Sequence, residues 1–298
     1  MPELPEVETV RRGLNQLTLN QKIAGADVLL HRTIAYPHSV DDFVTGIQGS
    51  VIATWHRRGK YLLAELSLEN AKTENVPASP RPSLPLSSSI GFLGVHLRMT
   101  GQLLWLHRDE ALHKHTRVRL FFENGWELRF VDQRTFGQMW WVPPEKKLES
   151  VMTGLAKLAA DPFSPDFTVD YLANKLQKSH RPIKTALLDQ SVVAGLGNIY
   201  ADEALFLSGI LPETLCTDLQ REQIERLQSA IIKVLATSIE VGGTTFSNFL
   251  NVKGVNGNYG GVAWVYNRAG EPCRVCSTPI QRIRLAGRSS HFCNQCQK

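Results

Sequence analysis

The first residues of the chain place apolar side chains at a helical period. The spacing is three or four residues throughout, at Leu4, Val7, Val10 and Leu14. Pro5 suits an early helical position, and Gly13 weakens the pattern near its end. We therefore predict an amphipathic helix over the opening residues.

A second pattern of short apolar runs follows, separated by Gly, His and Arg. Their length predicts strands over Ile23–Leu30, Ser50–His56, Tyr61–Leu66, Ile90–Leu97, Gly101–Leu106, Thr116–Phe122 and Trp126–Asp132. Residues 67–89 interrupt them with four prolines and six serines, a composition typical of a disordered surface insertion. Residues 1–142 are thus predicted to form a β-sandwich or flattened barrel that carries an N-terminal helix.

After Pro143 and Pro144 the period becomes helical, over Lys157–Gly209 and Asp218–Val241. One basic helix is expected to carry Lys175, Lys178, His180, Arg181 and Lys184. Residues 143–243 are predicted as a helical domain, 244–261 as a Gly- and Asn-rich loop, and 262–298 as a strand-turn module. The fold class is therefore α+β with several domains.

Charge adds a weak indication. The chain has 33 Lys and Arg against 28 Asp and Glu, a formal charge of +5, which suits a polyanion partner such as nucleic acid. Many basic proteins bind no nucleic acid, so charge does not decide the question. The opening residues are unlike a secretory signal, and no apolar run is long enough for a membrane span. We expect a cytoplasmic protein with no membrane partner.

Two Cys-x2-Cys pairs indicate a metal site. Sixteen residues separate the first pair from the second, and the four cysteines are Cys273, Cys276, Cys293 and Cys296. This is the spacing of a four-thiolate zinc ribbon, whereas two disulfides or a redox pair would suit an exported protein better. Four protein ligands leave no position for a catalytic water, so one structural Zn²⁺ is expected. The segment between the pairs carries Arg282, Arg284 and Arg288, which suggests a phosphate-facing surface or an ordinary solvated hairpin.

Four segments resemble bacterial-type formamidopyrimidine-DNA glycosylases (the Fpg or MutM family, in its zinc-ribbon form): Pro2–Val10, His96–Gly101, Gly195–Ala201 and Gly270–Cys273. With the cysteine pairs they span nearly the whole chain, in the family's order. The resemblance implies an N-terminal β-sandwich, a helix-two-turn-helix domain and a C-terminal β-hairpin zinc ribbon. It also implies a bifunctional DNA glycosylase and AP lyase that excises oxidised purines, 8-oxoguanine and formamidopyrimidines, from damaged duplex DNA. Such an enzyme would act as a monomer in base excision repair, associated with a bacterial nucleoid.

The resemblance assigns the chemistry to five residues. Removal of Met1 would expose the secondary amine of Pro2, and a free α-amino group titrates close to neutrality and can attack a sugar carbon. Glu3 takes the acid role and Glu6 positions the sugar or the helix terminus, although acidic residues in a first helical turn also simply complement the helix dipole. Lys60 and Arg288 grip phosphates and serve in β- and δ-elimination; without the family match, a single lysine would be taken as a surface residue.

The resemblance also assigns the DNA contacts. Met99, Arg134 and Phe136 would fill the void left by a flipped base, although the first and last would otherwise be taken as core residues. Thr135 departs from the arginine common at that position. Further DNA contacts are expected from His115, Asn198, Lys178, Arg181 and Lys184.

Three alternatives remain open. A helix-turn-helix of this kind also occurs in DNA-binding proteins without catalytic activity. In a zinc-ribbon DNA-binding protein of that class, Pro2, Glu3 and Lys60 would have no catalytic role. The endonuclease VIII branch prefers oxidised pyrimidines, and Leu4 disfavours it because that branch carries Gly there.

The segment Thr244–Gly261 matches a loop that closes over an everted purine, and its Asn258-Tyr259-Gly260 departs from some relatives.

Overall fold

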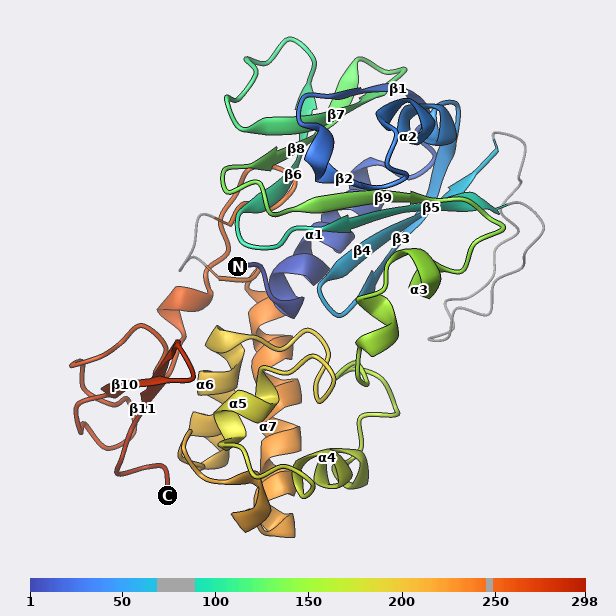
Figure 1. The fold of residues 1–298 in the computed structure, drawn as a ribbon. Coiled ribbons are helices and arrows are strands. Elements are labelled where there is room, and N and C mark those ends of the chain that lie inside the picture. The colour runs from blue at the N-terminus through green and yellow to red at the C-terminus, as the bar shows by residue number, and fades with distance from the viewer. Residues whose placement is uncertain (69–88, 245–248) are drawn as a thin grey trace. The chain divides into compact units, whose positions relative to one another are not determined.

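The computed structural model describes residues 1–68, 89–244 and 249–298, so most of the insertion predicted over 67–89 and part of the loop predicted over 244–261 lie outside the described residues. The chain forms two compact units (Figure 1). The first unit comprises Met1–Pro2, Glu6–Ala156 and Ser247–Gly257; the second comprises Glu3–Pro5, Lys157–Phe246 and Asn258–Lys298. The predicted domain ranges stay predictions.

The first unit is built from two sheets, as predicted. One has the order β1-β7-β8-β6 and is antiparallel, with β1 Ile23–Val28, β6 Gly101–His107, β7 Thr116–Phe122 and β8 Trp126–Asp132. The other has the order β2-β9-β5-β4-β3, with β2 Ile34–Tyr36, β3 Val51–Arg58, β4 Tyr61–Ser67, β5 Ser89–His96 and β9 Gln138–Val142. Only the β2–β9 pairing in this sheet is parallel.

One apolar core joins both sheets and the N-terminal helix. Helix α1 (Leu4–Leu17) contributes Val7, Val10 and Leu14, all fully buried, and strands of both sheets supply the remaining contacts. The helix continues past Gly13 to Leu17. A Cβ at Gly13 would lie 2.3 Å from Cγ2 of Val252, so the glycine permits close packing of that segment and does not end the helix.

The sequence pattern missed helix α2 (Val40–Ile47), which lies in a region interpreted as strands. Ser39 caps this helix by accepting a hydrogen bond of 3.1 Å from the Asp42 N–H, and Phe43 and Ile47 are its buried residues. Strands β2 and β9 were missed as well. The unit also contains the 3₁₀ turn His31–Thr33 and the short helix α3 (Leu148–Val151).

Helices form most of the second unit: α4 (Val169–Leu176), α5 (Ile183–Leu187), α6 (Asn198–Ser208) and α7 (Arg221–Glu240), with 3₁₀ turns at Cys216–Asp218 and Tyr259–Gly261. A further 3₁₀ turn, Leu155–Lys157, lies where the two units meet in the sequence. Helix α6 is buried on nearly every side and packs against α7. Cys216 is buried in the core of this unit.

The single basic helix expected over 175–184 does not exist. Helix α4 ends at Leu176 and α5 begins at Ile183. Pro182 lacks an N–H and disfavours helical backbone at Arg181, so a helix is not expected to run through this position. Lys178, His180 and Arg181 therefore lie in the connection between the two helices.

The C-terminal module is a hairpin of β10 (Gln281–Leu285) and β11 (Arg288–Phe292). Its two-residue turn has positive φ at both central residues, 45° at Ala286 and 77° at Gly287, which is the geometry that matches the twist of the flanking strands. Within the described parts of the chain, no helix combines the length and the apolar character that a membrane crossing requires.

Candidate functional site

The Glu3 carboxylate lies at the N-terminus of α6. Its Oε1 accepts a hydrogen bond of 3.1 Å from the Ile199 N–H, and the side chain is 3% exposed. The adjacent Leu4 N–H donates to the Gly195 carbonyl at 3.0 Å. Free N–H groups and the positive end of the helix dipole both attract a carboxylate at this point. Glu3 is thus fixed as an acid directly next to Pro2 in the chain.

The glycines of Gly195-Leu196-Gly197 make room for this arrangement. A Cβ at Gly197 would lie 2.3 Å from Cδ of Glu3, and one at Gly195 would lie 2.8 Å from the Leu4 side chain. Gly195 also has φ of 84°, which L side chains rarely adopt, whereas Gly197 has an extended backbone that alanine can adopt. The turn therefore holds the Glu3 carboxylate because neither glycine carries a side chain.

We predict that Gly197→Ala displaces the Glu3 carboxylate with little loss of stability, because only the end of a flexible side chain must move. The rate of the base release that the family resemblance implies should fall by about tenfold or more. The free energy of unfolding, measured by thermal unfolding, should change by about 1 kcal/mol or less. Gly195→Ala is the matched control, because it should reduce stability through backbone strain. Full activity of Gly197→Ala would show that the position of the Glu3 carboxylate is unimportant.

Lys60 lies at the β3–β4 turn and is 6% exposed. Arg57 holds this turn, because its Nη1 donates to the Gly59 carbonyl at 3.2 Å. Arg57 is in turn bound by Glu8 of α1, with 3.2 Å between Nε and Oε2. Glu8 also binds Arg11 at 2.7 Å and Arg12 at 2.9 Å. A partly buried ionic cluster therefore holds the backbone that carries Lys60.

The Glu8 carboxylate should make the first unit sensitive to acid. Burial raises its pKa, but hydrogen bonds and the charges of Arg11, Arg12 and Arg57 outweigh burial and bring the pKa from 4.5 to about 2. A lowered folded-state pKa contributes stability above the unfolded value, and this contribution disappears as the pH falls from 4.5 towards 2. Glu8→Gln should therefore cost about 2 kcal/mol at pH 7, after allowance for solvent screening, and much less near pH 2.5. Denaturant unfolding at both pH values tests this, with the exposed Glu149→Gln as control; equal losses at both would contradict it.

His96 packs beside this turn. Burial lowers its pKa to about 3, and the charges of Arg98 and Lys60 add to the effect, so the ring is neutral at pH 7. Its Nδ1 accepts a hydrogen bond of 3.0 Å from the Arg98 N–H, and its ring meets that of Tyr61 edge-on at 4.5 Å. A neutral ring near Lys60 adds no competing positive charge.

A buried carboxylate that the sequence analysis missed organises the residues predicted to enter DNA. Asp132 is 1% exposed and accepts hydrogen bonds from the Gly137 N–H at 2.7 Å, the Arg134 N–H at 3.2 Å and the Thr100 hydroxyl at 2.5 Å. It thus connects the turn next to Met99 with the turn that carries Arg134 and Phe136.

The exposure of these residues argues against a core role. Phe136 is 53% exposed and lies under the Arg134 guanidinium, whose central carbon is 5.1 Å from the ring centroid. Met99 is half-buried. Thr135 has φ of 57°, unusual for a β-branched residue.

The predicted backbone contacts differ in their surroundings. Lys178 and Arg181 are exposed, and Arg181 forms an ion pair of 3.0 Å with Asp189. Half-buried His115 has its Nδ1 3.1 Å from Nη2 of Arg117, and burial together with nearby cations lowers its pKa. Asn198 begins α6 and donates from Nδ2 to the Ser289 carbonyl at 3.1 Å.

Lys184 does not fit its predicted role. Its side chain is 1% exposed and forms an ion pair with Asp202, so in this conformation it is not available to an external phosphate. The expectation that it contacts DNA came from treating residues 175–184 as one exposed basic helix. The break at Pro182 places Lys184 on α5, which is mostly buried.

The segment after the predicted capping loop is held by Glu203, a second residue the sequence analysis missed. Its carboxylate is fully buried and accepts from the N–H groups of Trp264, Val265 and Tyr266 at 2.8–2.9 Å and from the Tyr259 hydroxyl at 3.1 Å. Burial raises the pKa of Glu203, although these hydrogen bonds oppose the effect. The Tyr266 phenol forms a side-chain hydrogen bond with Asn198.

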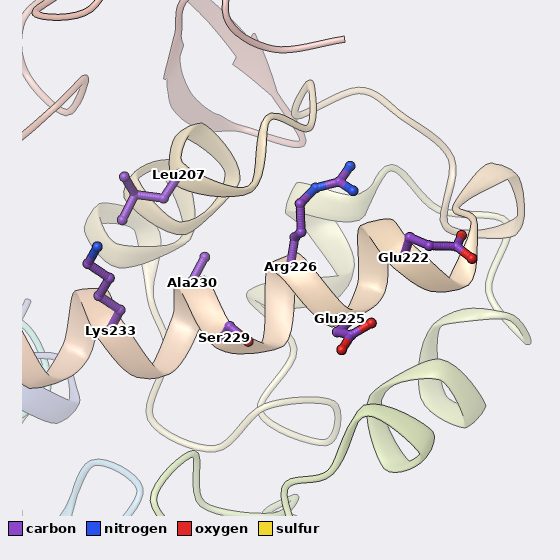
Figure 2. Close-up of a pocket in the computed structure, with 7 residues that line it drawn as sticks. All are labelled: Leu207, Glu222, Glu225, Arg226, Ser229, Ala230 and Lys233. Atoms are coloured by element: carbon purple, nitrogen blue, oxygen red, sulfur yellow. The ribbon is translucent and has the colours of Figure 1, made fainter.

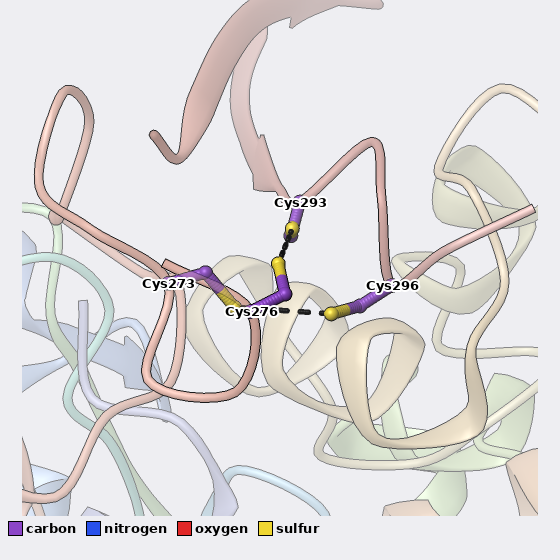
Figure 3. Close-up of side chains that lie close together, drawn as sticks. All are labelled: Cys273, Cys276, Cys293 and Cys296. Carbon is purple, nitrogen blue, oxygen red and sulfur yellow. Dashed lines mark hydrogen bonds between the residues drawn. The ribbon is translucent and has the colours of Figure 1, made fainter. Parts of the chain in front are cut away.

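The four cysteines converge as predicted (Figure 3). Their sulfurs lie within 4.8 Å of one another, with 3.4 Å between Cys276 and Cys293 and 3.9 Å between Cys273 and Cys296. A tetrahedral zinc with Zn–S bonds of about 2.3 Å requires sulfur separations of roughly 3.8 Å. The set therefore fits one structural Zn²⁺, which fills its coordination shell with protein ligands.

Arginines line the hairpin next to this site. Arg288 is exposed at the first position of β11, immediately after the turn. A hollow on the hairpin is lined by Arg282, Ile283, Arg284, Gly287 and Ser289. This surface can accept an anionic group.

A further pocket lies over α7 (Figure 2). Leu207 of α6 lines it together with α7 residues of both charges, Glu222, Glu225, Arg226, Ser229, Ala230 and Lys233. None of the predicted catalytic or DNA-binding residues contributes to it.

The predicted site residues are divided between the two units. The first holds Pro2, Glu6, Lys60, Met99, His115, Arg134 and Phe136, and the second holds Glu3, Lys178, Arg181, Lys184, Asn198, Arg288 and the four cysteines.

Comparison with known proteins covers the full length of the chain. Family models match residues 1–139 as the formamidopyrimidine-DNA glycosylase N-terminal domain, 158–249 as the H2TH domain of the same enzyme, and 270–298 as a zinc finger found in FPG and IleRS. The formamidopyrimidine-DNA glycosylase of Nostoc sp. is 76% identical over 297 residues and 100% of both chains, and that of Trichodesmium erythraeum is 64% identical over 307 residues and likewise 100% of both.

Solved structures agree. Lactococcus lactis Fpg in complex with DNA that contains an abasic site has a TM-score of 0.85 at 32% identity and covers 99% of both chains. The MutM (Fpg) protein of Thermus thermophilus has a TM-score of 0.82 at 34% identity, covering 99% of this chain and 98% of the other. The predicted resemblance, fold class and zinc ribbon are thus confirmed.

Proposed function

Because the chain belongs to the formamidopyrimidine-DNA glycosylase family, we propose that it excises 8-oxoguanine and formamidopyrimidines from duplex DNA and then cleaves the strand. The observation that carries this proposal is the fixed position of the Glu3 carboxylate on the Ile199 N–H, directly adjacent in the chain to Pro2. An immobilised acid next to a secondary amine is the pair that covalent base excision requires. Among solved relatives, Lactococcus lactis Fpg variants are described in complex with DNA that contains Fapy-dG.

Base excision begins at Pro2 after removal of Met1. The nitrogen lone pair attacks C1′, the bond from C1′ to the base breaks, and the base leaves with that electron pair and takes up a proton. The Glu3 carboxylate takes up the proton that the Pro2 nitrogen loses, and the bond between C1′ and O4′ then opens. Glu3 delivers a proton to O4′ as the nitrogen forms an iminium with C1′. Glu6, fully buried one turn further along α1, keeps the sugar-binding end of the helix in place.

Strand cleavage follows from the iminium. It acidifies the proton on C2′; loss of that proton forms the C2′=C3′ bond as the 3′-phosphate leaves. Loss of the C4′ proton then forms a second double bond as the 5′-phosphate leaves. Lys60, held at the β3–β4 turn, binds the phosphate next to the lesion and serves in the first elimination. Arg288, exposed at the start of β11, binds the phosphate that leaves in the second.

The remaining predicted residues hold and open the duplex. Met99 and Phe136 enter the base stack and Arg134 hydrogen-bonds the base left without a partner, in line with the exposure of Arg134 and Phe136. His115, Asn198, Lys178 and Arg181 bind phosphates, and Asn198 does so at a helix N-terminus, where an anion is favoured. Zinc supplies no chemistry and stabilises the hairpin that carries Arg288.

Cleavage of end-labelled duplexes tests this function. With 8-oxoguanine opposite cytosine, or with a formamidopyrimidine, we expect base release and a one-nucleotide gap with phosphates at both ends. A duplex with an oxidised pyrimidine should react more slowly. Faster reaction of the oxidised pyrimidine would favour the endonuclease VIII specificity. Tight binding without base release by protein that lacks Met1 and contains zinc would favour a non-catalytic DNA binder.

A further inference from the structure

A buried carboxylate on α6 connects that helix to the zinc hairpin. Asp202 is 1% exposed, and its Oδ2 lies 3.0 Å from the His291 backbone N–H and 3.1 Å from Nδ1 of the same residue. Its other oxygen is paired with the Lys184 ammonium. One side chain of α6 therefore binds both β11 and α5.

Lys184 extends the same network. Its Nζ lies 3.4 Å from the Asn198 carbonyl and 3.5 Å from the Ser289 carbonyl, in addition to its pair with Asp202. Ser289 also accepts a hydrogen bond of 3.1 Å from Nδ2 of Asn198. These polar contacts fix positions 289 and 291 of β11, on either side of the fully buried Ser290.

The polar contacts of Asp202 and Lys184 reach the hairpin next to Arg288, away from the apolar cluster of the ribbon. Apolar packing around Phe206, Val265 and Ile280 holds the ribbon next to the cysteines. The contacts to Asp202 and Lys184 reach positions 289 and 291 instead, and Arg288 immediately precedes them. The backbone of Arg288 pairs with Leu285 of β10, and the polar contacts of Asp202 and Lys184 hold the residues that follow it in β11.

We propose that Asp202 is a positioning residue for Arg288, acting through the backbone of β11 and the ammonium of Lys184. This rests on the proposed function, in which Arg288 assists the second elimination. Asp202 has no contact with substrate in this scheme. Loss of its charge leaves the buried Lys184 ammonium with only the weaker electrostatic attraction of Glu3, so the network reorganises and the hairpin end that carries Arg288 shifts. Base release depends on Pro2 and Glu3 and should change less.

The ratio of the two cleavage products tests the proposal. A 5′-labelled duplex with 8-oxoguanine separates the product of β-elimination from that of β,δ-elimination on one gel. Asp202→Asn with a full complement of zinc should move the ratio towards β-elimination by about fivefold, in the same direction as Arg288→Gln. Asp170→Asn, which breaks an exposed ion pair with Arg221 in the same unit, should leave the ratio unchanged. A simple loss of folded enzyme lowers both products together and does not move the ratio.

A second variant covers the case in which Asp202→Asn fails to fold. His291→Phe removes the ring contact, keeps the apolar bulk and leaves the backbone contact, so it should shift the ratio in the same direction by about twofold. A wild-type ratio in the zinc-loaded variants would overturn the proposal. If wild-type protein itself releases no base, the proposed function fails instead, so the two failures are distinguishable.

Discussion

Glu3→Gln is expected to lower the rate of base release from an 8-oxoguanine duplex by about 10²–10³-fold, because the amide cannot deliver a proton to the opening sugar. The amide still accepts a hydrogen bond from the Ile199 N–H, so the N-terminus of α6 keeps its partner and the fold should be retained. Single-turnover rates at saturating enzyme measure this effect free of product release.

The matched control is Glu149→Gln, an exposed glutamate on α3 outside the proposed site. Its rate should equal that of the wild type. A Glu3→Gln rate within about threefold of the wild type would remove Glu3 from the acid role and leave it as a helix cap.

Removal of zinc should abolish strand cleavage and weaken binding to a duplex with an uncleavable abasic-site analogue by about 100-fold or more. The ribbon contributes only Val265, Ile280 and two of the cysteines to a small apolar cluster that it shares with Phe206 of α6, so metal binding supplies most of its folding free energy, about 10 kcal/mol or more. Without the ribbon, Arg288 and the contacts to Asn198 and Asp202 lose their position.

A colorimetric assay for released metal should find one zinc per chain, and Cys293→Ala should reproduce the chelated protein. Loss of zinc with full DNA affinity would contradict the account. Near-ultraviolet circular dichroism provides a control. Trp105 and Trp126 stack in the first unit, and their signal should persist because that unit should stay folded.

The sequence predicted best where one physical requirement governs a local pattern. Alternating burial in β7, the helical spacing of Val7, Val10 and Leu14, and the two Cys-x2-Cys pairs each reflect a single constraint: one buried face or one tetrahedral ion. The residues of the candidate site were predicted one by one from a family resemblance. The comparisons with known proteins confirm the family and its fold, and the roles of the individual residues stay proposals.

Elements and partners that depend on distant contacts were harder to predict. Helix α2 is short and lies between strands, and its signal was only a Ser39 cap and two apolar residues one turn apart. The prediction of one basic helix over residues 175–184 did not take Pro182 into account. Asp202 and Glu203 act through partners far along the chain, such as Trp264 and His291, so no local pattern indicates what they bind. Lys184 was misjudged for the same reason, because its partner Asp202 lies one helix away.

Borohydride trapping tests the central claim most directly. Protein lacking Met1 is mixed with a duplex carrying 8-oxoguanine opposite cytosine, and borohydride reduces any iminium to a stable covalent adduct. The account predicts an adduct with the wild type, far less with Pro2→Gly, and none when Met1 is retained, because the nitrogen of Pro2 is then an amide. No adduct from processed, zinc-loaded wild type, or an equal adduct with Met1 in place, would contradict nucleophilic attack by Pro2.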